Sequence, residues 1–367
     1  RTGSSWRPLF GRKTLLYKEW MVRLTPIDIK SLPAEELRER LAEKAIPAFR
    51  ARQIQDWLDK GVSDFAQMSN LPQALREELS QTFTIPCVKI EKKLVSSLDN
   101  TVKYLYGLPD GETVESVLME YKHGWSQCLS TQVGCRMGCS FCATGMGGFV
   151  RNLLPSEMLA QIEQAQTDNG IRVSSVVLMG MGEPLDNYDN VLRFLKMLAE
   201  DGGVHIGMRH VSLSTCGLVD KIYQLMEEKL QLTLSISLHA PNDDIRSRLM
   251  PVNHRWPVEE LLKACRAYIQ ATSRRISFEY AMIQGVNDSD ACAHELADRL
   301  KGMLCHVNLI PANEVAGKSH RRSSQARLRA FCGVLEKRGV NVTVRRTLGA
   351  DISASCGQLR RRQETGV

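Results

Sequence analysis

The chain has no long hydrophobic run, few aromatic residues and no marked excess of either charge. One of its longest apolar stretches, Val173 to Met181, contains two serines and is far shorter than the roughly eighteen residues that a membrane-spanning helix needs. Aromatic residues make up 6% of the chain, and 48 lysines and arginines against 41 acidic residues give a net charge of +7. The composition excludes an integral helical membrane protein, and the mild positive charge permits a nucleic-acid partner without requiring one.

The cysteines also do not form the paired framework that is typical of a small secreted, disulfide-rich domain. Eleven cysteines, an odd number, are spread from Cys87 to Cys356, which favours a reducing compartment. Near the start, Arg7, Arg12 and Lys13 interrupt the apolar residues, so no signal-peptide core is visible. We therefore expect a cytoplasmic protein and set residues 1–20 aside as an extension of doubtful status.

Length and composition predict one large domain with a smaller companion. The chain has 367 residues, of which 43% are hydrophobic and 24% charged, as in ordinary globular proteins. Within residues 21–86, three segments place apolar residues three and four positions apart and are bounded by Pro or Gly, which predicts a helical accessory domain. These segments are 32–45, 47–61 and 71–83.

Residues 87–124 alternate with a period of two, which predicts a strand meander that links the helical domain to the rest of the chain. In the region 125–356, and most clearly after Leu153, apolar runs of strand length recur with amphipathic helical stretches between them. Repeated strand–helix units predict an α/β core with a parallel sheet, open or barrel-like. Residues 357–367 form a basic tail.

Polar residues follow several of these expected strands, where chemistry collects in parallel α/β folds. Turn geometry alone would also explain the Gly and Pro residues at these places. The segments are Gly180 to Pro184, Ser214 to Gly217, Ser237 to His239 and Pro311 to Asn313.

Three cysteines within eight residues are the strongest local signal. Cys135, Cys139 and Cys142 have the spacing C-x3-C-x2-C and are followed by a glycine-rich stretch to Gly148. Core thiols and a structural zinc site are the alternatives, but no neighbouring His or Cys pair completes a zinc-finger pattern. Three thiolates on a [4Fe–4S] cluster would leave one iron free to bind a substrate or cofactor.

This spacing resembles the signature of radical S-adenosylmethionine (SAM) enzymes, in which SAM chelates the free iron, and Gly182-Glu183-Pro184 is similar to their segment for the methionine amino group. The resemblance implies a partial (β/α)6 TIM-like barrel. Further segments narrow it to the RlmN family of dual-specificity adenine-C2 RNA methyltransferases, from about Pro26 to Leu359. They include CLSTQVGCRMGCSFCATG, VVLMGMGEPLDN, SLHAPND, RSRLMPVN and GADISASCGQL.

The resemblance implies methylation of C2 of one adenosine in the peptidyl-transferase region of 23S rRNA and of an anticodon-loop adenosine in tRNA. Because C2 is electron-poor and carries no acidic proton, polar methyl transfer has no nucleophile to use. The implied route uses two SAM molecules per turnover: one methylates a protein cysteine, and the other is cleaved reductively at the cluster, with a donor such as flavodoxin. The resulting S-methylene radical adds to C2, which gives a covalent enzyme–RNA adduct.

By the same resemblance, Cys356 carries the methyl group, Cys128 resolves the adduct by forming a transient disulfide with Cys356, and Glu115 accepts the C2 proton. From the residues alone, Cys356 could be a core thiol and Glu115 a solvated strand residue. The residues matched to SAM binding are Gly182, Glu183, Ser214, Ser237, Leu238, His239 and Asn313. His239 alone would more often be structural.

Basic clusters support an RNA partner, with backbone phosphates as their targets. They are Arg50/Arg52, Arg274/Arg275, Arg321/Arg322, Arg345/Arg346 and Arg360 to Arg362. A related alternative is a Cfr-type enzyme that methylates C8 of adenine, although Pro184, the segment 148–153 and Cys216 are more similar to RlmN. A non-catalytic iron–sulfur RNA-binding module would need neither Glu115 nor Cys356. We expect a monomer.

Overall fold

The computed structural model describes residues 26–200, 204–313, 315 and 317–354. Contacts divide the chain into two compact units, Arg1–Pro86 and Cys87–Val367. No helix among the described residues has the length and apolar character needed to span a bilayer.

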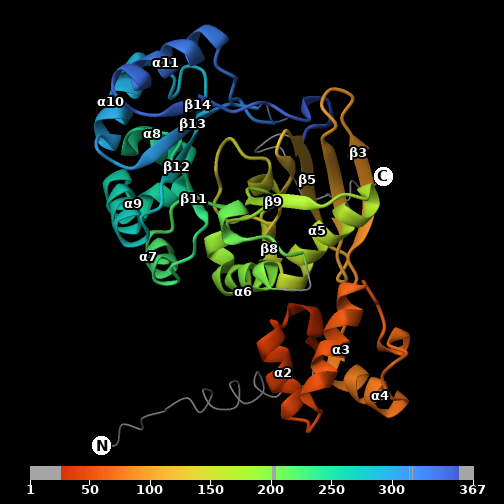
Figure 1. Ribbon diagram of the computed structural model, residues 1–367. Helices are drawn as coiled ribbons and strands as arrows, with labels where there is room; N and C mark the ends of the chain where they lie inside the picture. The colour runs from red at the N-terminus through yellow and green to blue at the C-terminus, as the bar shows by residue number, and fades with distance from the viewer. Residues whose placement is uncertain (1–25, 201–203, 314, 316, 355–367) are drawn as a thin grey trace, which may run out of the picture. The chain divides into compact units, whose positions relative to one another are not determined.

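The first unit is helical, as the three-and-four spacing predicts. Each of its three helices begins directly after a proline, whose fixed φ angle suits a helix start. The helices are α2 (Ala34–Ala42), α3 (Ala48–Asp59) and α4 (Gln73–Thr82), and Figure 1 shows them packed together. Their apolar faces form a separate core that includes Leu41, Ile54 and Leu79. A short parallel pairing of β1 (Ile27–Asp28) with β2 (Phe83–Thr84), which the sequence pattern does not predict, joins the two ends of the unit.

The second unit is built on one ten-stranded sheet with the order β14-β13-β12-β11-β10-β9-β6-β5-β4-β3. Strands β6 and β9 to β14 pair in parallel, whereas β3, β4 and β5 extend the sheet in antiparallel fashion from β6. The strands are β3 (Lys89–Val95), β4 (Val102–Gly107), β5 (Thr113–Tyr121), β6 (Gly124–Cys128), β9 (Val173–Leu178), β10 (Val211–Thr215), β11 (Thr233–Ser237), β12 (Ile276–Met282), β13 (Cys305–Pro311) and β14 (Val342–Val344). The meander expected over 87–124 is therefore continuous with the core sheet.

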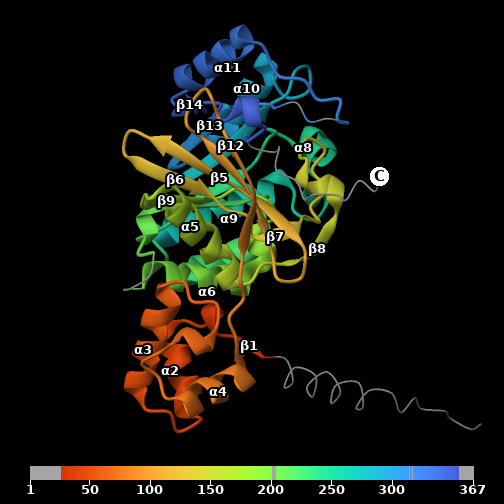
Figure 2. The ribbon, with the colours of Figure 1, turned by 90° about the vertical axis from the view of Figure 1, so that its right-hand side faces the viewer.

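Helices follow the parallel strands in the order expected of a partial (β/α)6 barrel. They are α5 (Pro155–Asn169), α6 (Tyr188–Ala199), α7 (Val219–Glu227), α8 (Asp243–Leu249), α9 (Val258–Thr272), α10 (Asp290–Leu300) and α11 (Gln325–Lys337). Figure 1 shows α7, α9, α10 and α11 outside the strands β11 to β14, and Figure 2 shows the strands from the side. The predicted α/β fold class is confirmed.

Strand register places polar residues in rows across the sheet. Because successive side chains point to opposite faces, Val211, Leu213 and Thr215 of β10 are buried while Ser214 is only half-buried. Ser237 of β11 pairs with Glu279 of β12, which pairs with Asn308 of β13. The fold thus aligns polar groups from three separate strands.

Candidate active site

The three clustered cysteines lie on one loop between two short strands. This loop joins β7 (Gln132–Gly134) to β8 (Phe149–Asn152), which pair antiparallel in a hairpin that the sequence pattern does not predict. The Cys135 N–H donates to the Gly148 carbonyl at 2.9 Å. Gly134 has φ +76°, and a Cβ there would lie 1.9 Å from the Gly148 oxygen. The close approach of the two strands therefore requires glycine at this position.

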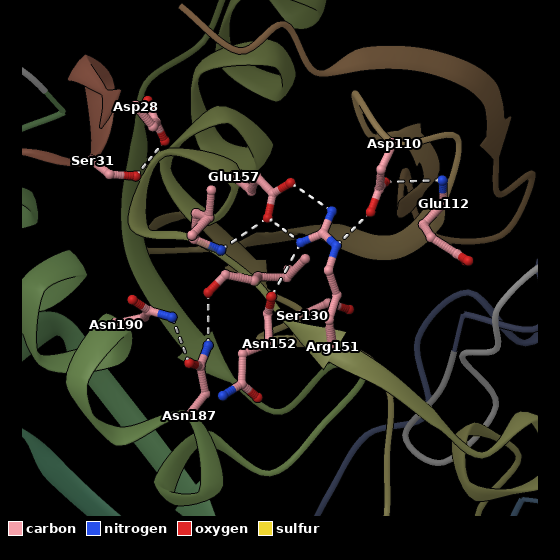
Figure 3. Close-up of polar contacts among 12 residues, drawn as sticks. Asp28, Ser31, Asp110, Glu112, Ser130, Arg151, Asn152, Glu157, Asn187 and Asn190 are labelled. Carbon is pink, nitrogen blue, oxygen red and sulfur yellow. Dashed lines mark hydrogen bonds and ion pairs between the residues drawn. The ribbon is translucent and has the colours of Figure 1, made fainter. Parts of the chain in front are cut away.

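A salt-bridge network holds this hairpin to its surroundings, as Figure 3 shows. Arg151 of β8 binds both carboxylate oxygens of Glu157 at 2.8 and 2.9 Å, and its Nε donates to Asp110 at 2.5 Å. Glu157 is 2% exposed and also accepts from the Leu154 N–H at the start of α5. The paired, two-pronged geometry is the strong form of an Arg–carboxylate contact, so the cysteine loop is anchored on a rigid base.

The cysteine loop forms one wall of a cavity of about 170 Å³. Nine of the site residues predicted from the sequence line it, and they come from the loop and from the ends of several barrel strands. They are Cys135, Cys139, Cys142, Gly182, Glu183, Ser214, Ser237, His239 and Asn313. Leu238 does not line the cavity: it is fully buried, its N–H donates to the Glu279 carbonyl, and its own carbonyl accepts from Arg246.

The thiols of the loop fit a metal cluster by their chemistry. Burial raises the pKa of Cys135 to about 12. Burial and the neighbouring thiols also raise the pKa of Cys139, while Arg246 opposes that rise. Such thiols need a strong positive charge to become thiolate ligands, which bound iron provides. Among the described residues, no three Cys, His, Asp or Glu side chains are arranged as ligands of one metal ion.

Glu183 is held rigidly at the floor of the cavity. It is 4% exposed, and one carboxylate oxygen accepts from the Leu185 N–H at 3.0 Å while the other accepts from the Cys216 N–H at 2.7 Å. Burial raises the pKa of Glu183, and these hydrogen bonds partly offset the rise. The Thr215 and Cys216 side chains also hydrogen-bond to this carboxylate, so its position in the cavity is fixed by four donors.

His239 lies in the cavity wall as a neutral ring with a defined tautomer. Its Nδ1 accepts from the Ala281 N–H at 2.9 Å, and its ring meets the edge of Phe141 at a centroid distance of 4.9 Å. Burial lowers the pKa of His239 to about 3. The ring is therefore neutral at physiological pH, and because Nδ1 accepts, Nε2 carries the proton and serves as a donor.

Sequence reasoning missed Glu279, although a lone acidic residue inside the apolar strand β12 is a detectable signal. Its carboxylate lines the cavity, is 4% exposed, and accepts from Ser277 at 3.0 Å and Asn308 at 2.8 Å. The Nη1 atom of Arg345 lies 3.9 Å from Oε2 of Glu279. Burial raises the pKa of Glu279, and Arg345 opposes the rise. Arg345 is 21% exposed and also lines the cavity.

Cys128 and Glu115 do not line this cavity. Cys128 ends β6 and is 7% exposed in a second cavity of about 30 Å³, which shares Met179, Ile310, Asn313 and Arg345 with the first. Glu115 of β5 is ion-paired with Lys103 at 2.9 Å. Ala354 also lines the second cavity, and Cys356 lies outside the described residues.

A buried hydrogen-bond network supports both of these residues. Ser130 Oγ donates to the Glu115 carbonyl at 2.5 Å, and Ser116 Oγ donates to the Cys128 carbonyl at 2.8 Å. Gln161 of α5 accepts from the Ser130 N–H at 3.0 Å and donates back to the Ser130 carbonyl at 3.0 Å. The backbones that carry Glu115 and Cys128 are therefore fixed to one helix.

Models of known protein families match segments in both units of this chain. The family model for the ribosomal RNA large subunit methyltransferase N-terminal domain matches residues 27–85, and the radical SAM superfamily model matches residues 129–296. The chain is 50% identical over 92% of its length to a probable dual-specificity RNA methyltransferase RlmN from Clostridium tetani, of which it covers 96%. The chain belongs to the RlmN family. The RlmN protein of Alkaliphilus oremlandii is 51% identical over the same share of this chain, with 98% of that protein covered.

A solved structure supports the same assignment. A radical SAM methyltransferase from Sphaerobacter thermophilus has a TM-score of 0.85 and 44% identity, and the match covers 91% of this chain and 99% of that chain. The predictions of family, fold class and enzyme class are confirmed: the chain is a SAM-dependent RNA methyltransferase of the radical SAM superfamily. Membership of the radical SAM superfamily implies SAM and a [4Fe–4S] cluster as cofactors. The three thiols that line the cavity fit these two cofactors.

Proposed function

We propose that this RlmN-family enzyme methylates C2 of a specific adenosine in 23S rRNA and in tRNA, with Cys356 as the methyl carrier, Glu115 as the base and Cys128 as the resolving thiol. The observation that carries the proposal is the shared wall of the two cavities. Four residues line both the cavity that holds the three loop cysteines and the cavity that holds Cys128. A methyl donor in the first cavity would therefore lie next to the thiol that resolves the adduct.

In this proposal, Cys135, Cys139 and Cys142 hold a [4Fe–4S] cluster, which supplies the electron for reductive cleavage of SAM when bound. The cavity residues orient SAM. Glu183 accepts from its ammonium group, the Ser214 and Ser237 hydroxyls and the Asn313 amide hold its carboxylate and ribose, and His239 donates from Nε2. Gly182, at φ +103°, lets the backbone approach closely: a Cβ there would lie 2.6 Å from Gln132.

Outside the cluster, two thiols and one carboxylate complete the reaction. The 5′-deoxyadenosyl radical from the second SAM would take one hydrogen atom from the S-methyl group of Cys356, and the remaining methylene carbon would form a bond to C2 of the adenine. The adduct would then lose the C2 proton to the Glu115 carboxylate and one electron to the iron–sulfur cluster. The Cys128 thiolate then attacks the sulfur of Cys356, which forms a disulfide and breaks the bond between that sulfur and the methylene carbon. The released carbon takes up a proton and becomes the methyl group of the product.

The helical accessory domain would recognise RNA shape. In α3, the Arg50 guanidinium lies 4.8 Å from the Phe49 ring centroid, and Phe49 is 59% exposed. An exposed aromatic ring beside a cation suits stacking on an unpaired base next to a phosphate. We further propose that the enzyme acts as a cytoplasmic monomer with a flavodoxin-type electron donor.

The test is reconstitution of the full chain with iron and sulfide under anaerobic conditions, followed by SAM, reductant and a 23S rRNA fragment or tRNA. Nucleoside mass spectrometry then identifies the product. We expect 2-methyladenosine, lost in Cys356→Ala, whereas 8-methyladenosine would assign a Cfr-type activity. An intact cluster without methylation of either RNA would instead support a non-catalytic binding module.

A further inference from the structure

We propose that Lys103 is a positioning residue that joins the Glu115 carboxylate to the segment around Ser353, so that the base and the segment that leads to the methyl carrier share one anchor. This inference rests on the proposed function. It concerns a lysine on β4 that the motifs of the sequence do not single out, and the contacts that carry it all lie among described residues.

Lys103 contacts both partners with one ammonium group. Its Nζ lies 2.9 Å from Oε1 of Glu115 and donates to the Ser353 carbonyl at 3.2 Å. Lys103 pairs with Val117 in the β4–β5 register, two residues from Glu115, so the two long side chains are diagonal neighbours on one face of the sheet. Their side chains are only 10% and 13% exposed. A pair this sheltered from water is worth more than a surface ion pair.

The backbone at Ser353 is held in an uncommon conformation. Ser353 has φ +50° and ψ +44°, in the left-handed region that non-glycine residues seldom adopt. Such a conformation is strained for a residue other than glycine and persists where surrounding contacts fix it. The hydrogen bond from Lys103 to the Ser353 carbonyl is one such contact, so Lys103 contributes to the local shape of the chain three residues before Cys356.

A second set of contacts fixes the same segment to the turn between β3 and β4. Asp351 accepts from the Ser96 hydroxyl at 2.7 Å and from the Ser97 N–H at 2.9 Å. These hydrogen bonds lower the pKa of Asp351. The Gly349 N–H donates to Asp99 at 2.9 Å. The antiparallel strands therefore act as a platform for residues 349–353, and Lys103 is the part of that platform that also contacts the base.

The two contacts of Lys103 have different chemical consequences. The ammonium 2.9 Å from Oε1 fixes the position of the carboxylate that would accept the C2 proton. When Glu115 takes up the C2 proton, Lys103 loses its anionic partner but keeps the Ser353 carbonyl. Protonation of the base is in this way linked to the position of the segment that leads to Cys356.

Substitutions at two positions separate these roles. Lys103→Met should lower formation of 2-methyladenosine at least about tenfold, as expected when a general base is impaired, and should leave more covalent enzyme–RNA adduct on a denaturing gel. Lys103→Arg should restore most of the product. Asp351→Asn weakens the platform without touching Glu115, so it should lower methylation of Cys356, read by peptide mass spectrometry, without raising the amount of adduct.

A matched control is Lys93→Met, which removes a lysine of the neighbouring strand β3 that is ion-paired with Asp168 at 2.6 Å. Amide hydrogen exchange in the peptide that contains residues 349–354 gives a readout independent of activity. We expect faster exchange there in Lys103→Met than in Lys93→Met. Thermal unfolding and iron content show whether each variant is folded and loaded.

The outcomes distinguish this inference from the proposed function. If the wild-type enzyme makes no 2-methyladenosine, the proposed function fails, and unchanged hydrogen exchange in Lys103→Met would separately overturn the anchor. If the wild-type enzyme is active and Lys103→Met matches Lys93→Met in product, adduct and exchange, Lys103 is not a positioning residue.

Discussion

Arg246 and Glu183 bind opposite sides of the same residue, Cys216. Arg246 Nη2 donates to the Cys216 carbonyl at 2.6 Å, and the Cys216 N–H donates to Glu183 Oε2 at 2.7 Å. Arg246 is fully buried on α8, and its other acceptors are the Ser237 and Leu238 carbonyls and the Asn253 amide oxygen. A single guanidinium therefore ties together the ends of β10 and β11 behind the cavity.

This arrangement predicts that removal of the guanidinium strongly lowers the stability of the fold. Arg246→Met leaves several buried acceptors without donors, each worth about 1 to 3 kcal/mol, so we expect the free energy of unfolding of the apoprotein to fall by about 3 kcal/mol or more. Arg246→Lys keeps the charge but cannot reach all four oxygens, so it should rescue only part of the loss. Urea unfolding monitored by circular dichroism measures both variants. A loss below about 1 kcal/mol in Arg246→Met would contradict this role.

Much of this organisation is predictable from the sequence because the elements are long and periodic. The helices of the accessory domain and the buried strands β9 to β13 follow directly from apolar spacing, and the cysteine spacing locates the cysteine loop. The contacts made by Arg246 and Lys103 are not predictable in this way. Their partners are mostly backbone carbonyls or residues distant in sequence, such as Ser353 for Lys103, and no side-chain motif encodes such contacts.

Short elements were missed for a related reason. The hairpin β7–β8 has strands of three and four residues, too short for a periodic signal, and it forms because Gly134 allows the approach to Gly148. Glu279 lies inside an apolar strand and becomes part of the site only because strand register places it beside Ser237 and Asn308. Topology, rather than local pattern, brings these groups together.

The buried, neutral ring of His239 should make the stability of the apoprotein sensitive to acid. Its pKa of about 3 lies below the ordinary value of 6.5 because burial disfavours the charged ring. The unfolded chain then binds more protons than the folded one between these values, so stability is greatest above pH 6.5 and declines as the pH falls toward 3. The size of the effect is about 3 to 5 kcal/mol at full extent.

Urea unfolding of the apoprotein between pH 4 and pH 7 measures this decline. In His239→Gln the slope of stability against pH should be smaller across that interval, while His205→Gln, at an exposed histidine, serves as the control. An equal slope in His239→Gln and the native sequence would show that another group accounts for the acid sensitivity.

The close contact at Gly134 predicts that the cysteine loop cannot keep its conformation when this residue carries a side chain. A Cβ at this position would lie 1.9 Å from the Gly148 oxygen, and the residue has φ +76°, so Gly134→Ala is both a clash and a strained conformation. We expect loss of bound iron after reconstitution and a fall in stability of about 2 kcal/mol or more. Gly147→Ala is the matched control in the same loop, since a Cβ there would meet nothing within 4 Å. Normal iron content in Gly134→Ala would contradict this account of the loop.

The division of the chain between Pro86 and Cys87 predicts that RNA recognition and cluster binding can be separated. Each unit has its own buried apolar cluster, so a chain that begins at Cys87 should fold and bind iron with the normal stoichiometry. If α2 to α4 recognise RNA shape, this shortened chain should lose methylation of 23S rRNA and tRNA while it still cleaves SAM in the presence of reductant. Substituting Arg50→Ala and Phe49→Ser in the full chain tests the same surface without removing the domain. The expected result is a raised KM for RNA with unchanged cleavage of SAM, whereas normal RNA methylation by the shortened chain would reduce the accessory domain to a structural role.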